Sequence, residues 1–297
     1  MIPPQFEYHA PHSLSDAIGL LQQYGSDAKV LAGGQSLIPL LKLRLASPTH
    51  LIDLQHVPGL KTLEEHGVNV VIGSMVSESR IEHSPLLRRH FPGLVEASEA
   101  VADPVVRNYA TLGGNLAHAD PANDHPAMML ALGAQLVAQG PKGQRTISID
   151  DFLVDTFETA LAPDEILVEI HLPHQASNDS LHSGSAYVKL ERKVGDYAIA
   201  AVAAQVTLNG AVCMRAGLAL TNVGPKAIRV AEAERFLVGK QLDDATIGEA
   251  AKLAAAAAEP TADLRGPVDY KRAVVRTLAA RALHQAASRA QKGTHHA

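Results

Sequence analysis

Apolar residues in the first part of the chain recur at helical spacing and then at strand spacing. The helical face consists of Leu14, Ala17, Ile18 and Leu21. Because Ser13 can cap this segment and Gly25 can end it, the pattern predicts a helix between them. The other expected elements are strands at 29–32 and 51–54 with a helix at 37–44 between them. Together they predict one compact α/β unit over residues 1–56.

The middle and last parts of the chain differ in how strand-like and helix-like segments are ordered. Expected strands of the middle part are 68–73, 136–137, 146–149 and 165–172, and expected helices are 94–101 and 126–132. The polar stretch 173–184 is typical of a linker. After it come strand-like segments at 186–190, 198–208 and 212–220, then helical segments at 227–238, 244–258 and 268–290. Strands grouped before helices predict an α+β domain, and we assign the last helical stripe to the core.

Length and composition limit the classes of protein that the chain can represent. It has 297 residues, 46% of them hydrophobic, which is enough for about two domains. A net charge of −5 and 4% aromatic residues without Trp argue against nucleic-acid binding. No apolar run is long enough to span a membrane, and no signal-peptide pattern opens the sequence, so a cytoplasmic location is expected. The single cysteine, Cys213, excludes an internal disulfide and a Cys-ligated zinc or iron–sulfur site within the chain.

Two glycine pairs carry the most informative chemistry, Gly33-Gly34 and Gly113-Gly114. Adjacent glycines let the backbone adopt positive φ and approach a ligand closely. Successive N–H groups in such a turn form a concave set of donors suited to phosphate oxygens, and two such sets suit the pyrophosphate of a dinucleotide. A single Gly-Gly pair more often marks an ordinary tight turn. The residues alone therefore leave a binding site and a pair of plain turns both open.

Other nucleotide and catalytic motifs are missing from the sequence. The G-x-G-x-x-G spacing of a Rossmann site does not occur, nor do a Walker A loop, H-E-x-x-H or G-x-S-x-G. Among the 15 histidines, His118 and His125 lie near the second glycine pair, but neither has a partner at metal-ligand spacing. We therefore expect no metal site and no catalytic acid, base or nucleophile in this chain.

Several segments, in this order, resemble the FAD-binding medium subunits of molybdenum hydroxylases, the xanthine dehydrogenase family, and in particular those of the aerobic carbon monoxide dehydrogenase type. The resemblance is carried by residues 1–9 (MIPPQFEYH), 31–39 (LAGGQSLIP), 102–104 (ADP), 111–115 (TLGGN), 120–124 (DPAND), 189–198 (KLERKVGDYA), 220–223 (LTNV) and 263–267 (DLRGP). It implies an α+β fold: an FAD-binding domain over 1–177, of the PCMH or vanillyl-alcohol-oxidase-like type, with subdomains 1–56 and 57–177. A C-terminal domain of the CO dehydrogenase flavoprotein type would follow over 178–297.

The same resemblance implies FAD as the cofactor, extended between the two glycine motifs. The implied cofactor-binding residues are Lys29, Ala32, Gly33, Gly34, Gln35, Ser36, Leu37, Thr111, Leu112, Gly113, Gly114, Asn115, Asp124, Leu161, Lys189 and Tyr197. The two motifs would hold the pyrophosphate through backbone N–H groups, and Lys29 would lie near the adenosine half. Asp124 would contact the ribityl or phosphate region, and Leu161, Lys189 and Tyr197 would lie near the isoalloxazine ring.

Each side chain also has a plainer interpretation. Lys189 and Arg192 belong to a polar run that could be a solvated face. Tyr197 could be a core aromatic whose hydroxyl is satisfied. Either Asp120 or Asp124 could cap the helix that begins near Pro126.

The resemblance implies that this chain is one of three subunits. A large subunit would carry the molybdopterin site, and a small subunit would pass electrons through two [2Fe–2S] clusters to the FAD of this chain. An external acceptor such as a quinone would then take the electrons. A cytoplasmic dimer of heterotrimers is expected. A peripheral position at the inner face of the membrane, through the partners, is the alternative.

The substrate stays open at this stage. Gln35 stands where carbon monoxide dehydrogenases usually carry His. Gln is common at this place in family members that act on aldehydes or N-heterocycles. The cysteine-bearing insertion of the benzoyl-CoA reductase type is missing. A stand-alone flavin oxidoreductase related to vanillyl-alcohol oxidase is an alternative, although the region after Gly184 is short for its substrate domain. A flavin-binding assembly or sensor module without enzymatic activity is a further alternative.

Overall fold

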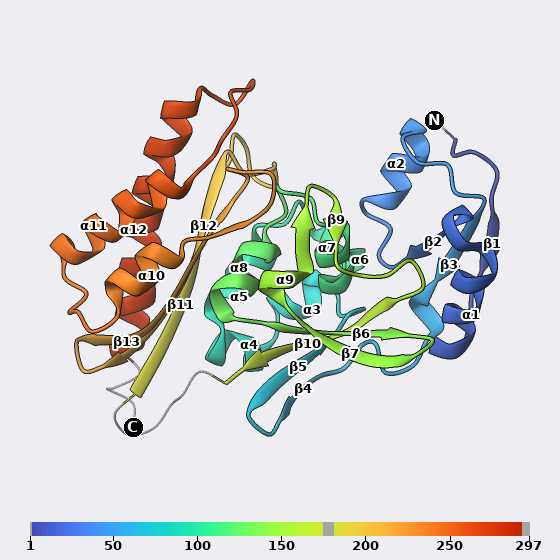
Figure 1. The fold of residues 1–297 in the computed structure, drawn as a ribbon, viewed down its shortest axis with the longest axis horizontal. Coiled ribbons are helices and arrows are strands. Elements are labelled where there is room, and N and C mark those ends of the chain that lie inside the picture. Colours follow the sequence, from blue (N-terminus) through green and yellow to red (C-terminus); the bar gives the residue numbers. More distant parts are fainter. Residues whose placement is uncertain (1, 175–180, 293–297) are drawn as a thin grey trace.

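The computed structural model describes residues 2–174 and 181–292 and divides into three groups of elements along the chain (Figure 1). The N-terminal group, blue in the figure, lies at one end of the molecule. The middle group lies at the centre, and the C-terminal sheet with its helices forms the other end. None of the described helices is both long enough and apolar enough to cross a membrane.

The N-terminal group is a small parallel sheet of three strands with two helices. Its elements are β1 (Glu7–His9), α1 (Leu14–Tyr24), β2 (Ala28–Leu31), α2 (Leu37–Leu43) and β3 (His50–Asp53), with strand order β1-β3-β2. The backbone N–H of Asp16 donates to Ser13 Oγ at 3.0 Å, and Gly25 ends the helix with a φ of 52°. The predicted cap and stop of α1 are thus confirmed, whereas the three-residue strand β1 was not predicted.

The middle group is a five-stranded antiparallel sheet covered by short helices. The strand order is β4 (Leu63–His66), β5 (Asn69–Gly73), β10 (Ile166–Pro173), β6 (Gln135–Gly140) and β7 (Gly143–Ser148). The helices are α3 (Glu78–Glu82), α4 (Pro85–His90), α5 (Pro92–Glu99), α6 (Pro104–Tyr109), α7 (Leu112–His118), α8 (His125–Leu132) and α9 (Ile149–Phe152), and β8 (Leu153–Asp155) pairs with β9 (Glu158–Thr159). Large side chains such as Phe91 and Phe152 are fully buried in the core that these elements share.

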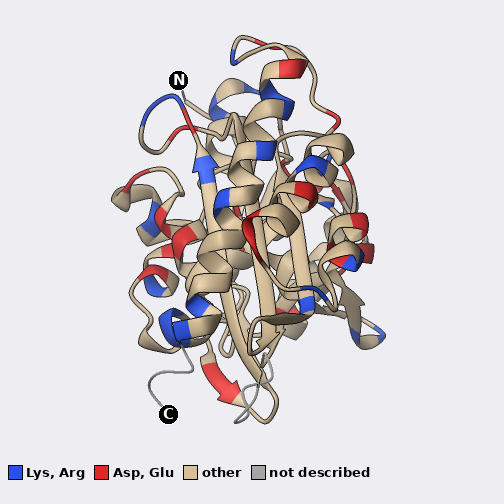
Figure 2. Cartoon of the chain, turned by 90° about the vertical axis from the view of Figure 1, so that its left-hand side faces the viewer, with Lys and Arg blue, Asp and Glu red and all other residues tan. Residues whose placement is uncertain are grey.

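The C-terminal group is a four-stranded antiparallel sheet followed by three helices. In order these are β11 (Leu181–Leu190), β12 (Ala200–Asn209), β13 (Val212–Thr221), β14 (Ile228–Arg229), α10 (Ala231–Leu237), α11 (Asp244–Ala257) and α12 (Val268–Lys292). This order confirms the expected α+β arrangement. Charged residues of both signs are interspersed over the face that these helices present (Figure 2).

Strand β12 shows why the chain folds around this sheet. Successive side chains of a strand point to opposite faces, and every residue from Ala200 to Leu208 is buried. Ala201 and Ala203 join the core of the middle group, whereas Val202 and Val206 join the core beneath α12. Both faces of the C-terminal sheet are therefore covered. The apolar stripe of α12 lies in that second core, as expected.

Two sequence-based boundaries were wrong. Strand β10 extends to Pro173 and β11 already begins at Leu181, so the expected linker 173–184 is partly strand, and residues 175–180 of it lie outside the described residues. The helix expected over 227–238 begins only at Ala231, because Ile228 and Arg229 pair with β13 as a short edge strand.

Candidate cofactor site

The two glycine motifs lie directly against each other. An ideal Cβ on Gly33 would lie 1.9 Å from the Tyr109 carbonyl oxygen, at the end of α6. An ideal Cβ on Gly114, in the first turn of α7, would lie 3.4 Å from the Cβ of Ala32. The missing side chains thus allow the loop after β2 to pack on the junction between α6 and α7. Residues about eighty positions apart in the sequence form one surface here.

The first motif has the properties of an anion-binding turn. Gly34 adopts a positive φ of 74°, which favours glycine. Within the described part of the chain, no backbone N–H from Ala32 to Ser36 donates a hydrogen bond, although all five residues are partly buried. Amides in such a position need an acceptor from outside the chain or from water. This run of free donors is what a pyrophosphate requires.

The second motif differs from the expectation. Gly113 and Gly114 form the first turn of α7 and neither has a positive φ. Their N–H groups are used internally: Gly113 donates to the Ser74 carbonyl at 2.9 Å, and Gly114 donates to Thr111 Oγ1 at 3.1 Å. The neighbouring N–H groups of Leu112 and Asn115 donate to the Val76 and Thr111 carbonyls. A free donor nest at the second motif was therefore a wrong prediction.

The glycines of the second motif serve close packing. A Cβ on Gly113 would lie 2.4 Å from the Cβ of Ser74, just after β5, so only glycine lets α7 approach that far. Asn115 lies one turn into the helix, and its backbone carbonyl accepts a bond from Asn123 Nδ2 at 2.8 Å. Its own side-chain oxygen is buried without a hydrogen-bond partner among the described residues. The second motif thus shapes the wall of the site and presents one unsatisfied acceptor.

Asp124 and Lys189 form a buried ion pair next to these motifs. Lys189 Nζ lies 3.1 Å from Asp124 Oδ2 and 3.3 Å from Glu191 Oε2, and it donates to the Ala100 carbonyl at 2.9 Å. The Tyr187 hydroxyl donates to Asp124 Oδ1 at 2.7 Å. Because the Lys189 side chain is only 6% exposed, the solvated-face interpretation of this residue is wrong.

The electrostatics of this pair follow from its burial. Burial raises the pKa of Asp124, and the Lys189 ammonium and the Tyr187 hydroxyl oppose that rise. Burial and the neighbouring Asp124 raise the pKa of Tyr187 well above its usual value, so its hydroxyl stays a donor. Asp124 makes no capping bond to α8, and Asp120 instead accepts from the N–H of Ala122 at 2.9 Å. Capping of α8 by either aspartate is therefore not observed.

Three of the remaining predicted residues are less buried than this ion pair. Lys29 is exposed on β2, and Leu161 is half-buried against the main core after β9. Tyr197 is 51% exposed, which rules out the core interpretation. Partial burial and the nearby carboxylates of Asp120 and Asp124 raise its pKa. Its ring is thus available to a ligand.

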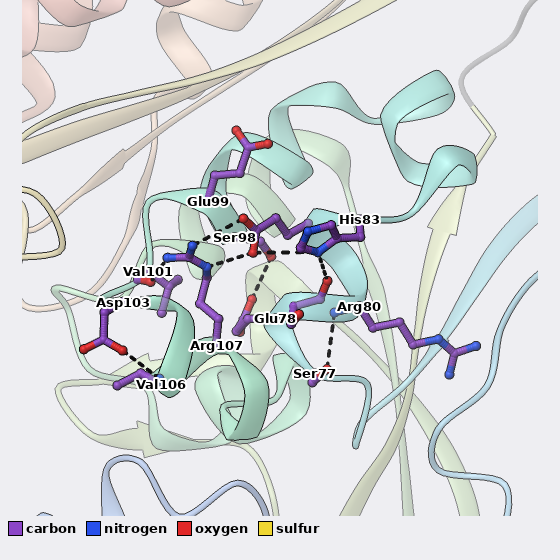
Figure 3. Close-up of polar contacts among 12 residues, drawn as sticks. Ser77, Glu78, Arg80, His83, Ser98, Glu99, Val101, Asp103, Val106 and Arg107 are labelled. Carbon is purple, nitrogen blue, oxygen red and sulfur yellow. Dashed lines mark hydrogen bonds and ion pairs between the residues drawn. The ribbon is translucent and has the colours of Figure 1, made fainter.

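Three polar residues that the sequence did not single out as a group meet behind this site. Glu78 Oε2 accepts a bond from Ser98 Oγ at 2.7 Å and lies 2.6 Å from His125 Nε2. Figure 3 shows Glu78 and Ser98 turned toward each other from α3 and α5. All three side chains are fully buried. No spacing could reveal this cluster, because its members are 20 to 47 positions apart.

A separate group could in principle hold a metal ion. Glu7, His9 and His50 bring three ligand atoms within 4.8 Å of one another on strands β1 and β3. His9 Nε2 and His50 Nδ1 are paired with each other at 3.1 Å, and Tyr24 stacks on the His50 ring. One nitrogen of each histidine is thus engaged with the other ring, and the expectation of no metal site stays a prediction.

The residues present therefore suit a cofactor with a diphosphate. Five free amides face the turn at the first motif, while Asn115 offers an unsatisfied acceptor on the adjoining helix. Lys189 holds a buried positive charge that is paired with Asp124. A cation in such a position stabilises negative charge that develops on a bound ring.

The comparisons with known proteins agree with this geometry. Residues 4–175 match the FAD binding domain in molybdopterin dehydrogenase, and residues 185–286 match the CO dehydrogenase flavoprotein C-terminal domain. The carbon monoxide dehydrogenase medium chain of Hydrogenophaga pseudoflava is 45% identical over 289 residues, which cover 97% of this chain and 99% of that protein. The corresponding chain of Afipia carboxidovorans is 41% identical, over 98% of this chain and 100% of that protein.

Solved structures of such proteins are also similar to this chain. Carbon monoxide dehydrogenase from Hydrogenophaga pseudoflava, 46% identical, superposes with a TM-score of 0.94 over 98% of this chain and 100% of that one. Quinoline 2-oxidoreductase from Pseudomonas putida 86, 36% identical, gives 0.90 with the same coverage. The predicted family and fold class are thus confirmed. The chain belongs to the FAD-binding, medium-chain family of molybdopterin dehydrogenases, and FAD is its cofactor.

Proposed function

We propose that this chain is the flavoprotein subunit of a three-subunit molybdenum hydroxylase. It would accept electrons from a small [2Fe–2S] subunit, which receives them from a large molybdopterin subunit. The observation that carries the proposal is the run of free amides at 32–36, packed on the second glycine motif in a chain that matches medium chains over nearly its whole length. The flavin supplies the redox chemistry when bound, and the protein supplies binding and orientation.

We assign the pyrophosphate to the amides of residues 32–36, with Leu37 starting the helix behind them. Thr111, Leu112, Gly113, Gly114 and Asn115 form the adjoining wall through packing, as the amides from Leu112 to Asn115 have internal partners. Lys29 would contact the adenosine half, and Asp124 the ribityl or phosphate region. Leu161 and the half-exposed Tyr197 would flank the isoalloxazine ring. Lys189 would place its ammonium near that ring and stabilise the negative charge that the ring gains on reduction.

The finer assembly follows the family pattern. We assign a division of the chain near residues 57 and 177, a dimer of heterotrimers, and a quinone as external acceptor. We also assign a cytoplasmic location, with attachment to the inner face of the membrane through the partner subunits.

Carbon monoxide is the substrate that we assign to the whole complex, because the two medium chains of 45% and 41% identity belong to carbon monoxide dehydrogenases. Gln35 favours the second candidate, an aldehyde or N-heterocycle. The nicotine 6-hydroxylase medium subunit of Paenarthrobacter nicotinovorans is 36% identical over 96% of this chain. Substrate choice belongs to the large subunit, so the medium chain alone does not decide it.

Purification of the complex from native cells tests the proposal. We expect co-elution with one large and one small chain, equimolar FAD, and reduction of the flavin by carbon monoxide but not by N-heterocycles. A lone active flavoprotein would support the stand-alone oxidoreductase instead. A lone inactive flavoprotein would support a sensor or assembly module, and the absence of bound FAD would overturn the proposal.

A further inference from the structure

Glu78 and His125 form an ion pair in the middle of the core. Both side chains are 0% exposed, and the distance from His125 Nε2 to Glu78 Oε2 is 2.6 Å. Ser98 Oγ donates to the same carboxylate oxygen at 2.7 Å (Figure 3). Three helices contribute one residue each, namely α3, α5 and α8. Because His125 directly follows Asp124 in the chain, the pair lies beside the Asp124–Lys189 contacts.

Burying this pair is unfavourable for the free energy of folding. Moving two charged groups from water into the core costs free energy of desolvation. Their mutual attraction offsets this cost only when their remaining polar atoms also form hydrogen bonds. Here Glu78 Oε1 and His125 Nδ1 are both buried without a hydrogen-bond partner in the described structure. Apolar residues of similar volume would often be as stable. A contribution to stability is therefore a poor explanation for the pair.

The position of the pair suggests another role. The backbone N–H of Glu78 donates to the Ala110 carbonyl at 2.9 Å, and Ala110 directly follows Tyr109, whose carbonyl oxygen faces Gly33. At the other end, His125 directly follows Asp124, whose carboxylate holds Lys189 and Tyr187. The pair therefore connects the glycine motifs to the ion pair of the site.

We propose that Glu78 and His125 form a positioning pair for the flavin, in which Glu78 keeps a positively charged imidazolium immediately behind Asp124. This inference rests on the proposed function, because it assumes that Asp124 and Lys189 face the flavin. The imidazolium supports the ionised state of Asp124, and ionised Asp124 fixes the ammonium of Lys189. The ammonium of Lys189, held in this position, favours the addition of electrons to a flavin beside it.

The surrounding groups agree with this charge state. Burial lowers the pKa of His125, whereas the nearby carboxylates of Glu78 and Asp124 raise it. Together these effects raise the pKa of His125 above its usual value. His125 in turn lowers the pKa of Asp124. The other groups that face the cluster are Ser98 from α5 and, through Asp124, Tyr187 and Lys189 from β11. Glu191 contacts Lys189 on its far side.

Two measurements on the full-length chain test the proposal. The first is the ¹⁵N spectrum of labelled histidine in the wild-type protein, where we expect His125 to give an imidazolium signal throughout the range from about pH 6 to pH 8, around the usual histidine pKa. A neutral imidazole in this range would overturn the proposal. This measurement requires no variant and no bound flavin.

The second measurement is the midpoint potential of bound FAD in His125→Gln and Glu78→Gln. Both variants remove the buried imidazolium, directly or by removing its counterion. His125→Gln removes the positive charge alone, whereas Glu78→Gln removes a negative charge together with the imidazolium, so the larger effect belongs to His125→Gln. In that variant we expect FAD to stay bound and the reduced form to bind about tenfold more weakly relative to the oxidised form, a fall of ~30 mV for a two-electron couple. Ser98→Ala is the control, because it removes a hydrogen bond to the same carboxylate without changing a charge, and its potential should stay that of the wild type.

Each outcome decides the matter. Unchanged potentials in both charge variants, or an equal shift in Ser98→Ala, would show that the pair only fills the core. If one charge variant does not fold, the other and the wild-type spectrum decide. A wild-type chain that binds no FAD would overturn the proposed function instead, whereas the histidine spectrum would still report the state of the pair.

Discussion

The α-carbon of Gly33 faces the carbonyl group of Tyr109 so closely that a Cβ would lie 1.9 Å from the oxygen. This contact holds the loop after β2 against the end of α6, 76 positions later in the chain. It thereby fixes the free amides of residues 32–36 beside the second glycine motif. The first glycine of the first motif is needed for this approach, and the second glycine for its positive φ.

Gly33→Ala should therefore abolish FAD retention. The backbone carbonyl of Tyr109 cannot move as a flexible side chain would, so the loop must shift and the amides lose their common orientation. The ratio of flavin absorbance to protein, measured after gel filtration, checks this. We expect less than a tenth of the wild-type FAD content.

Gly19→Ala is the matched control for this substitution. Gly19 lies on the exposed side of α1 and has nothing within 4 Å of its ideal Cβ. Alanine should stabilise the helix there by ~0.5–1 kcal/mol and leave FAD binding unchanged. Full FAD content in Gly33→Ala would show that the assignment of the pyrophosphate to residues 32–36 is wrong.

Lys189→Met should make the stability of the protein fall as pH rises. Asp124 would lose the ammonium and keep the Tyr187 hydroxyl and the nearby His125, so its pKa, already raised by burial, would rise further. The folded chain would then hold a proton that the unfolded chain releases above about pH 4. Stability is therefore lost between that pH and the new folded pKa. Breaking a buried pair costs ~3–5 kcal/mol.

Urea unfolding at pH 5 and pH 8 measures this effect. The double variant Asp124→Asn/Lys189→Met is the control, because it removes the titrating carboxylate and should lose the additional pH dependence. Equal pH profiles for Lys189→Met and the double variant would contradict the assignment of the effect to Asp124.

How much of the fold can be predicted from the sequence depends on how far apart in the chain the interacting residues are. The helix α1 and the order of strands and helices after β11 follow from local periodicity and capping, and both were predicted. The strand β1 and the helices α3, α4 and α6 were not, because segments of three to six residues carry too few positions for a period to show. These helices are specified by Ser or Asp caps, such as Ser77 and Asp103.

The site follows the same rule. Glycine pairs are visible in the sequence, but only the fold distinguishes the free amides after Ala32 from the satisfied ones after Thr111. The contact of Tyr187 with Asp124 spans 63 positions, and that of His125 with Glu78 spans 47. No local pattern encodes such pairs, since each residue alone fits an ordinary strand or helix.

Thr111→Ala should weaken the first turn of α7. Thr111 Oγ1 accepts the N–H of Gly114 at 3.1 Å, and loss of such a cap costs ~1 kcal/mol. The freed N–H of Gly114 would then be available beside Ala32, so the affinity for FAD should fall severalfold at most. Thermal unfolding and FAD titration measure the two effects. Thr111→Ser keeps the oxygen and should resemble the wild type in both, and an equal loss in Thr111→Ser would argue against the cap.

Glu165 fixes the loop that carries Leu161, and this gives a pH prediction of the opposite sign to that for Lys189→Met. Arg145 donates two hydrogen bonds to the Glu165 carboxylate, each 2.7 Å long, and one to the Ala160 carbonyl at 2.6 Å. The N–H of Ala162 donates to the same carboxylate at 2.8 Å. The bond to Arg145 is the main reason why the pKa of Glu165 is lowered.

Glu165→Gln should therefore destabilise the protein at neutral pH and progressively less in acid. A carboxyl group whose pKa is lower in the folded chain stabilises it above the unfolded pKa, near 4.3, and that stabilisation disappears as pH falls through the folded value. Because Arg145 is half exposed, we expect a loss of only ~1 kcal/mol at pH 7. Urea unfolding of both proteins from pH 7 to pH 3 should show the two curves converge. Parallel curves would mean that the carboxylate charge contributes nothing and that the loop is held by the Ala160 contact alone.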